Sequence, residues 1–349
     1  MTDNDKTPHA VFSVEEVKPN ERYDLWKDSI SCIFEVDAKK DVRHNKNFSA
    51  CIDANMFGSV MLATTSTAQQ SWDRNPLTIA QDGMDHIMIQ LYDSGNLYCE
   101  RNGKTSQMPE NGLMVFDLAQ EVKCKTDNFS NMSLIIPRNM LNDSLKDIDD
   151  QHLRELTANE PMVQLLRDHM LSLKRLSSSM SLKQSVQISP ATVSLAAACL
   201  NASESQTENS SFGVSVALLM NARRYIEANL TTSTLSSDEI AKAVHVSRSR
   251  LYNLFKPYNG IFSYIRERRL HLALKQLTDK KHQKYNIVDI AFNCGFTNSS
   301  YFTRAFKERF GMTPKDARFY GSCISFGGDQ YEDHVDRRYE EWMKTMVAF

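Results

Sequence analysis

Two short stretches of this 349-residue chain carry side chains that could read the edges of DNA bases. They are the outward-facing polar residues of two expected helices: Arg248, Ser249, Arg250, Asn253, Ser299, Ser300, Arg304 and Lys307. An arginine can donate two hydrogen bonds to O6 and N7 of guanine, and an asparagine can pair in the same two-bond manner with adenine. Such contacts require the side chains to project from the start of a helix lying in the major groove.

Each set falls on the second helix of a helix-turn-helix pattern. Helix, turn and helix are expected at residues 235–244, 245–247 and 248–256, and again at 286–294, 295–296 and 298–310. Two helices that cross over a short turn need a small residue at the contact, an apolar residue at the corner and an apolar residue in the shared core. The pairs that meet these needs, about fifty positions apart, are Ala241 and Ala291, Val246 and Phe296, and Leu251 and Phe302. A repeat of this length also occurs in solenoids, but two copies are too few for one.

The charge distribution supports a nucleic-acid partner. Residues 215–320 contain 18 Lys and Arg against 8 Asp and Glu, whereas the rest of the chain contains 23 against 35. A cationic segment of net charge +10 is therefore joined to an anionic segment of net charge −12. Positive charge clustered on a groove-binding motif is typical of a protein that contacts the phosphate backbone.

These residues resemble the AraC/XylS family of bacterial transcription regulators. The resemblance covers roughly a hundred residues and rests on the double helix-turn-helix, the joining segment 260–277, the corner 290–296 and the closing segment 306–314. Ala317 departs from the family pattern, which usually has an aromatic residue there. The resemblance implies base contacts by Ser249, Arg250, Asn253, Ser299, Ser300 and Arg304. It also implies that Arg269 holds the two units together, for which we expect an internal ion pair.

The basic residues near the end of the joining helix are candidates for phosphate contacts. They are Lys280, Lys281 and Lys284. Two units on one rigid helix would read two successive major-groove segments on one face of DNA, roughly 34 Å apart.

The composition indicates a cytoplasmic protein of two domains. At 41% hydrophobic residues the chain can bury sizeable cores. Its seven cysteines show no Cys-x-x-Cys pair, so we expect reduced, mostly buried thiols. The sequence contains no signal peptide and no apolar run of about 18 residues, so we expect neither secretion nor a membrane span.

The region from Phe48 to Pro137 has the alternating pattern of short strands. Val60–Thr64, Ile87–Leu91, Leu97–Cys99, Leu113–Phe116 and Met132–Ile136 are the expected strands, separated by Gly-containing turns. This pattern predicts a small antiparallel β-barrel or jelly roll. The region resembles the cupin-like sensory domain of the same family through its glycines at 95, 103 and 112 and the run 136–138. The overall expectation is an α+β multidomain chain with this barrel plus helices, followed by an all-α double helix-turn-helix domain.

The expected domains are 1–200 for the sensory and dimerisation domain, 201–212 for a linker, 213–320 for the DNA-binding domain and 321–349 for a helical tail. Helices expected at 161–176 and 190–200 either form a dimer interface, as is common in the family, or cover the open side of the barrel. Tail residues Val335, Tyr339, Trp342, Met343 and Met346 share helical spacing, and their role is open.

Three functions remain to be compared. The first is a transcription activator whose barrel binds a small-molecule effector; Trp72 and Arg74 could stack on and pair with an anionic ligand, or could simply be a core and a surface residue. The second is a regulator controlled by dimerisation or a protein partner alone. The third is a barrel enzyme, which the isolated histidines and the lack of a Gly-x-Ser-x-Gly elbow disfavour. We expect double-stranded DNA, RNA polymerase and a second copy of the chain as partners, with no metal, cofactor or catalytic residue.

Overall fold

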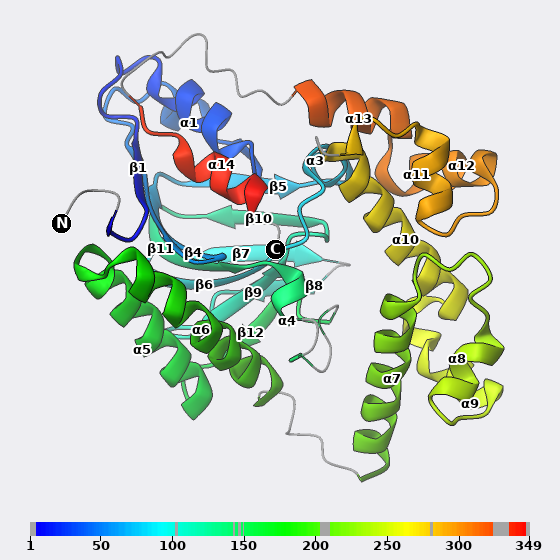
Figure 1. Cartoon of the computed structure of the whole chain (residues 1–349). Helices are drawn as coiled ribbons and strands as arrows, with labels where there is room; N and C mark the ends of the chain where they lie inside the picture. The colour runs from blue at the N-terminus through cyan, green and yellow to red at the C-terminus, as the bar shows by residue number, and fades with distance from the viewer. Residues whose placement is uncertain are drawn as a thin grey trace. The chain divides into compact units, whose positions relative to one another are not determined.

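The computed structural model of the chain describes residues 5–101, 104–141, 144–145, 148, 150–202, 210–279, 282–323 and 335–346. The chain divides into two compact units (Figure 1). Unit 1 comprises residues 1–78, 84–204 and 327–349, and unit 2 comprises residues 79–83 and 205–326. Residues 203–209 of the expected linker lie outside the described residues, and α7 already begins at Ser210.

Unit 1 is built on two antiparallel sheets. The strands are β1 (His9–Ser13), β2 (Glu35–Asp37), β3 (Ala50–Phe57), β4 (Val60–Thr67), β5 (Gln70–Arg74), β6 (Ile87–Ser94), β7 (Leu97–Arg101), β8 (Lys104–Gln107), β9 (Leu113–Asp117), β10 (Val122–Thr126), β11 (Phe129–Ile136) and β12 (Arg154–Leu156). The larger sheet has the order β1-β3-β4-β11-β6-β9-β12, and the smaller one has the order β2-β5-β10-β7-β8. Among the described strands no hydrogen-bonded pair joins the sheets, so the expected barrel is an open, jelly-roll-like pair of sheets rather than a closed ring.

The helices of unit 1 flank these sheets. They are α1 (Arg22–Ile30), α2 (Lys40–Arg43), α4 (Arg138–Leu141), α5 (Pro161–Leu176), α6 (Leu182–Ala202) and α14 (Arg338–Thr345). Helix α3 (Pro76–Asp82) begins in unit 1, and its residues from Ile79 onward belong to unit 2. Unit 2 contains α7 (Ser210–Ala228), α8 (Ser237–Ala243), α9 (Arg248–Leu254), α10 (Ile261–Thr278), α11 (Ile287–Asn293), α12 (Ser299–Phe310) and α13 (Pro314–Cys323).

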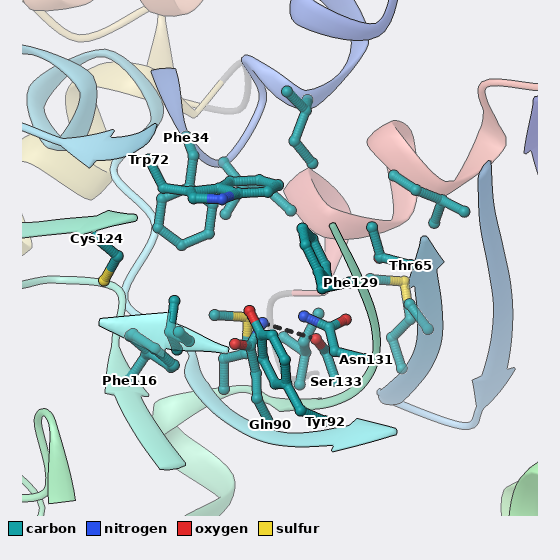
Figure 2. Close-up of a pocket in the computed structure, with 18 of the residues that line it drawn as sticks. Phe34, Thr65, Trp72, Gln90, Tyr92, Phe116, Cys124, Phe129, Asn131 and Ser133 are labelled. Carbon is teal, nitrogen blue, oxygen red and sulfur yellow. Dashed lines mark hydrogen bonds between the residues drawn. The ribbon is translucent and has the colours of Figure 1, made fainter. Parts of the chain in front are cut away.

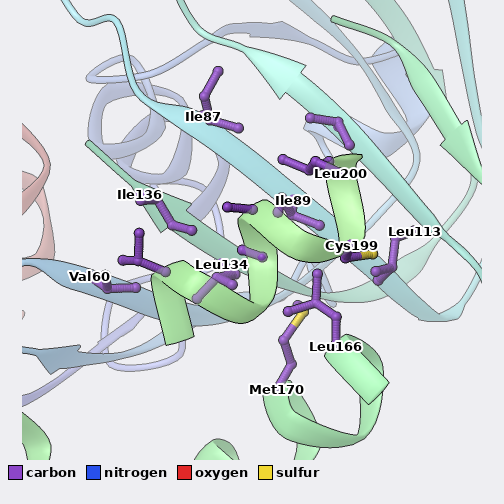
Figure 3. Packing of buried hydrophobic residues seen from close by; sticks show 14 of the residues in the cluster. Val60, Ile87, Ile89, Leu113, Leu134, Ile136, Leu166, Met170, Cys199 and Leu200 are labelled. Atoms are coloured by element: carbon purple, nitrogen blue, oxygen red, sulfur yellow. The ribbon is translucent and has the colours of Figure 1, made fainter. Parts of the chain in front are cut away.

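The central strands of the larger sheet are buried on both faces. On β11, Leu134 and Ile136 point to one face, while the alternate residues Ser133 and Ile135 point to the other. This follows from the two-residue period of a strand. Helices α5 and α6 cover the first face and pack against it with apolar side chains such as Leu166 (Figure 3). The second face lines a cavity between the two sheets.

The cysteine prediction was wrong for one pair. Cys99 on β7 and Cys124 on β10 are direct partners in the register of the smaller sheet and form a disulfide. Cys32, Cys199 and Cys294 are buried and form no disulfide, as expected. Burial raises the pKa of Cys294 to about 12, so this thiol stays protonated.

Helix α10 takes part in both hydrophobic cores of unit 2. Its first half contributes Ile261 and Ile265 to a core formed with α7, α8 and α9. Its second half contributes Leu270 and Leu274 to a core formed with α11, α12 and α13. Full burial of each such side chain stabilises the fold by roughly 1.5–3 kcal/mol. One continuous helix therefore fixes the separation of the two helix-turn-helix units.

The two turns also correspond in backbone geometry. His245 in the first and Gly295 in the second both have positive φ, at 55° and 85°. A Cβ atom built on Gly295 would lie 2.8 Å from the carbonyl oxygen of Leu230 and 2.7 Å from Nε of Arg269. No such crowding surrounds Gly311, whose φ is 74° and which has nothing within 4 Å of its Cβ position.

We predict that Gly295→Ala destabilises unit 2 by more than Gly311→Ala. Both variants incur the cost of a left-handed backbone, about 1 kcal/mol. Only Gly295→Ala also displaces Arg269 or the Leu230 carbonyl. Thermal and urea unfolding of the full chain measure the difference; equal losses of stability would contradict the crowding at Gly295.

Candidate nucleic-acid interface

Helix α9 presents the polar residues of the first helix-turn-helix to solvent. Leu251 faces inward and is fully buried, while Ser249, Arg250 and Asn253 are exposed. Arg248 is exposed as well, but its guanidinium is paired with Asp238 of α8. A DNA contact by Arg248 would therefore compete with this ion pair.

Helix α12 is held in place by a row of phenylalanines. Phe302, Phe306 and Phe310 are fully buried, with successive ring centroids 5.5 and 4.7 Å apart. The opposite side exposes Ser300, Arg304 and Lys307, which lie within one face because each residue turns the helix by about 100°. Ser299 lies to the side of this face and is half-buried.

Side-chain caps define where both exposed helices begin. Ser247 Oγ accepts a hydrogen bond from the backbone N–H of Arg250 (3.3 Å), and Asn298 Oδ1 accepts one from the N–H of Tyr301 (2.8 Å). The preceding helices are capped in the same way by Ser236 and Asn286. A cap of this kind typically stabilises a helix by about 1 kcal/mol. The caps therefore position the first turn of α9 and α12, from which base-reading side chains project.

Three arginines secure helices of unit 2. Arg269 of α10 donates to the carbonyl oxygens of Leu230 (2.9 Å) and Thr232 (2.7 Å). Its role is internal, as expected, but its partners are carbonyl groups rather than the acidic residue that we predicted. Arg268 pairs with Glu227 of α7 at 2.7 Å, and Arg309 of α12 pairs with Glu267 of α10. These contacts fix α7 and α12 against the shared helix.

Other cations of unit 2 face solvent. Arg250, Arg304 and Lys307 are exposed and form no ion pair with another described residue, so their charges are available to an anion. Lys284 is also exposed, and its Nζ lies 5.2 Å from the Tyr285 ring centroid. Lys280 and Lys281 lie outside the described residues.

The sequence prediction overlooked two exposed aromatic residues on these helices. Tyr252 of α9 is 43% exposed and Tyr301 of α12 is 44% exposed. Each borders the polar residues proposed for base reading. The signal in the sequence was the tyrosine next to the polar positions of each second helix. A hydrophobic pattern alone assigns tyrosine to the half-buried side of a helix, so it does not mark these residues as exposed.

Unit 1 contains a cavity between its sheets, with about 640 Å³ of empty space counting its open mouth. Trp72 of β5 lines it, packed edge-on against Phe34 and Phe129 (Figure 2). Arg74 lies outside the lining. It is fully buried and donates to the carbonyl oxygens of Leu118 (2.5 Å) and Ile33 (2.7 Å). The structure thus brings Trp72 to the cavity but gives Arg74 a structural role.

The described residues contain no group of three or more His, Cys, Asp or Glu side chains placed to hold a metal ion. In the same part of the chain, no helix combines the length and apolar character that crossing a membrane requires.

Comparison with known proteins identifies the C-terminal region. Residues 240–319 match the family model described as "Helix-turn-helix domain". The chain is 35% identical over 94 residues to the transcriptional activator RhrA of Rhizobium meliloti, covering 27% of this chain and 30% of RhrA. It is 34% identical over 102 residues to PqrA of Proteus vulgaris, described as a probable transcription factor, covering 28% of this chain and 81% of PqrA. This chain belongs to the AraC/XylS family of transcription regulators.

The fold of this AraC-family chain has a structural counterpart as well. The crystal structure of CuxR, an AraC-like transcriptional activator, aligns with a TM-score of 0.50 over 75% of this chain and 94% of CuxR. At 20% identity this likeness shows the shared fold of sheets and helical region. The sequence matches to RhrA and PqrA, in contrast, are confined to about 27–28% of the chain.

The acidic partner of Arg309 gives the DNA-binding unit a predictable pH response. Burial raises the pKa of Glu267, but hydrogen bonds and charges of His271 and Arg309 outweigh burial and lower it to about 2. Because its pKa is lowered in the folded state, Glu267 stabilises the fold at pH values above its ordinary pKa near 4.5. This contribution is lost as the pH falls toward about 2.

We predict that Glu267→Gln lowers the melting temperature of unit 2 at neutral pH and that the difference from the parent protein shrinks between about pH 4.5 and pH 2. Differential scanning calorimetry across this pH range measures the difference in melting temperature between the two proteins. A difference that stays constant with pH would show that the carboxylate charge is not what holds α12 to α10.

Proposed function

We propose that the protein is a sequence-specific transcription activator that responds to a small-molecule effector. Its α9 and α12 helices would enter two successive major-groove segments on one face of DNA. Ser249, Arg250, Asn253, Ser300 and Arg304 would contact base edges, while Lys284 and Lys307 would contact phosphates. Arg248 and Ser299 would have lesser roles, because Arg248 is paired with Asp238 and Ser299 is half-buried.

The observation that carries this proposal is the sharing of α10 by two hydrophobic cores. Because one 18-residue helix belongs to both cores, it sets the separation of the two capped, cation-bearing helices. A ligand that matches them must repeat a negatively charged surface at fixed spacing, which is the property of duplex DNA. The family membership of the chain agrees with this conclusion.

Selection of genomic fragments by the purified full-length chain at moderate salt tests the proposal. We expect recovery of a small set of fragments that share a sequence element, and a linear loss of affinity with the logarithm of salt concentration. Equal recovery of all fragments, with and without cell extract to supply a missing effector, would refute sequence-specific binding.

Base readers and phosphate contacts should respond differently to substitution. We predict that Arg304→Ala weakens binding to the selected element by about 1–3 kcal/mol and relaxes the preference at one base pair. Lys284→Ala should instead weaken cognate and scrambled DNA alike and reduce the salt slope by about 0.9. Fluorescence anisotropy at several salt concentrations measures both effects, and identical behaviour of the two variants on both DNAs would show that these roles are misassigned.

We propose that unit 1 binds the effector. Its cavity lies between two sheets and is lined mainly by apolar and aromatic side chains, as ligand sites usually are. A bound effector would alter the affinity of the protein for its operator or for RNA polymerase, which we propose as its partner at the promoter. The protein would act in the cytoplasm, where its DNA lies.

We also propose a homodimer that uses the outer faces of α5 and α6. The inner faces of both helices pack on the larger sheet, on the face opposite the cavity. Their outer faces nevertheless expose large apolar side chains: Leu165 is 55% exposed and Val186 is 50% exposed. We propose that these exposed apolar side chains become buried against another chain. A dimer would present two pairs of reading helices to repeated sites.

We predict that the double variant Leu165→Glu and Val186→Glu is monomeric at concentrations where the parent chain is dimeric, because two buried carboxylates would lack partners. Analytical ultracentrifugation measures the mass. Val288→Glu, at a valine of 44% exposure in unit 2, provides the control and should leave the dimer intact. A monomeric parent chain, or a dimeric double variant, would rule out this interface.

A further inference from the structure

The cavity of unit 1 has a lining without formal charge. Its polar members come from the inner faces of β4, β6 and β11 (Figure 2): Thr65, Gln90, Tyr92, Asn131 and Ser133. All its other members are apolar or aromatic, apart from Tyr339 of α14. Moving an ion from water into such a site costs several kcal/mol unless an opposite charge compensates it. Since Arg74 lies outside the lining and is bound to carbonyl groups, the lining offers an anion no such compensation.

One lining residue presents an acceptor atom that the fold does not use. Asn131 is 3% exposed; its side-chain amide hydrogen-bonds Tyr92, but its Oδ1 has no hydrogen-bond partner among the described residues. The neighbouring polar pair is already satisfied, because Gln90 Nε2 donates to Ser133 Oγ at 3.0 Å. A buried acceptor without a donor costs roughly 1–3 kcal/mol. A ligand carrying an N–H or O–H group would remove this cost and gain selectivity from it.

The C-terminal helix α14 forms part of the cavity wall. Tyr339 lines the cavity, is 1% exposed and shares a hydrogen bond with Ser29 of α1 at 2.8 Å. Its ring also packs edge-on against Phe12 of β1, with centroids 6.0 Å apart. Figure 1 shows α14 beside α1 and β1. The tail, whose role the sequence left open, is therefore part of unit 1.

Polar contacts hold α14 there along its whole length. At its start, the backbone N–H of Val11 donates to Asp336 (3.2 Å), and Arg337 pairs with Asp28 at 2.9 Å. In its middle, the buried Glu340 accepts hydrogen bonds from Ser29 and Arg337. At its end, Nε2 of His86 and the carbonyl oxygen of Met343 lie 3.1 Å apart. The helix also buries the apolar side chains Met343 and Met346, at 0% and 3% exposure, so undocking α14 would expose them together with the Tyr339 ring.

We infer that the cavity binds an uncharged, largely aromatic molecule that donates one hydrogen bond to Asn131, and that α14 is the element that closes over it. This inference rests on the proposed function, because it gives the effector a chemical class and a route of action. Ligand contact with Tyr339 would favour docked α14.

Three related probes test the ligand class with the full-length chain. Indole is uncharged and has an N–H donor, 1-methylindole lacks the donor, and indole-3-acetate is an anion. By calorimetry we expect saturable indole binding, an affinity for 1-methylindole lower by about tenfold or more, and no binding of indole-3-acetate. Asn131→Leu should abolish the preference for indole over 1-methylindole. Failure of indole to saturate at millimolar concentration, or preference for the anion, would overturn the assignment.

Hydrogen exchange tests the closing role of α14. At an indole concentration ten times Kd, amides of α14 should exchange about tenfold more slowly, because the ligand binds only the closed form. Tyr339→Ala should weaken indole binding about tenfold and remove this protection, and Glu341→Ala, at an exposed position of the same helix, should match the parent chain. Glu340→Gln, which keeps Tyr339 but weakens its neighbouring bonds, should show the same trend if Tyr339→Ala does not fold.

Indole binding with unchanged exchange in α14 would refute the closing role. Binding to a selected genomic fragment is measured on the same samples. If DNA binding is lost while indole binding and protection persist, the proposed function fails and the ligand site stands. If DNA binding persists without indole binding, only the ligand inference fails.

Discussion

The arrangement of the DNA-binding unit depends on one helix that is buried in two cores. Ile261 and Ile265 of α10 are enclosed by the first helix-turn-helix, and Leu270 and Leu274 by the second. Apolar burial of this size cannot be given up at either end without loss of several kcal/mol. The distance between α9 and α12 is therefore a property of α10. The polar side chains on these helices can match two segments of one DNA duplex only if that distance is fixed.

Arg269 and Gly295 show how closely the two cores are joined. The guanidinium of Arg269 reaches the carbonyl oxygens of Leu230 and Thr232 in the first half, and it passes so near Gly295 in the second half that only a glycine fits. Arg269 is thus held between the halves through hydrogen bonds and through sterics. The family resemblance indicated this joining role, but only the structure shows that its partners are backbone carbonyls.

Much of the fold could be predicted from the spacing of apolar residues and from the residues that cap the helices. The fifty-residue offset of Ala241 and Ala291 predicted both helix-turn-helix units to within two residues, since a small contact, a corner and a core residue recur in order. Other features depend on contacts distant in sequence, which no local pattern encodes. The Cys99–Cys124 disulfide arises from strand register, Arg74 is buried by three separate segments, and Tyr339 of the tail packs against β1. The positions of the candidate DNA contacts on α9 and α12 could be predicted because a local pattern sets them. The places of Arg74 and Tyr339 could not, because packing between distant segments sets them.

Hydroxyl-radical footprinting of the full-length chain on its selected DNA fragment tests the central claim most directly, because it reports which sugar positions the two helices shield. If α10 holds α9 and α12 at fixed separation, protection should appear as two patches about one helical turn, roughly 34 Å, apart on the same face of the duplex for each bound chain. A single patch per chain, or two patches on opposite faces, would contradict the account.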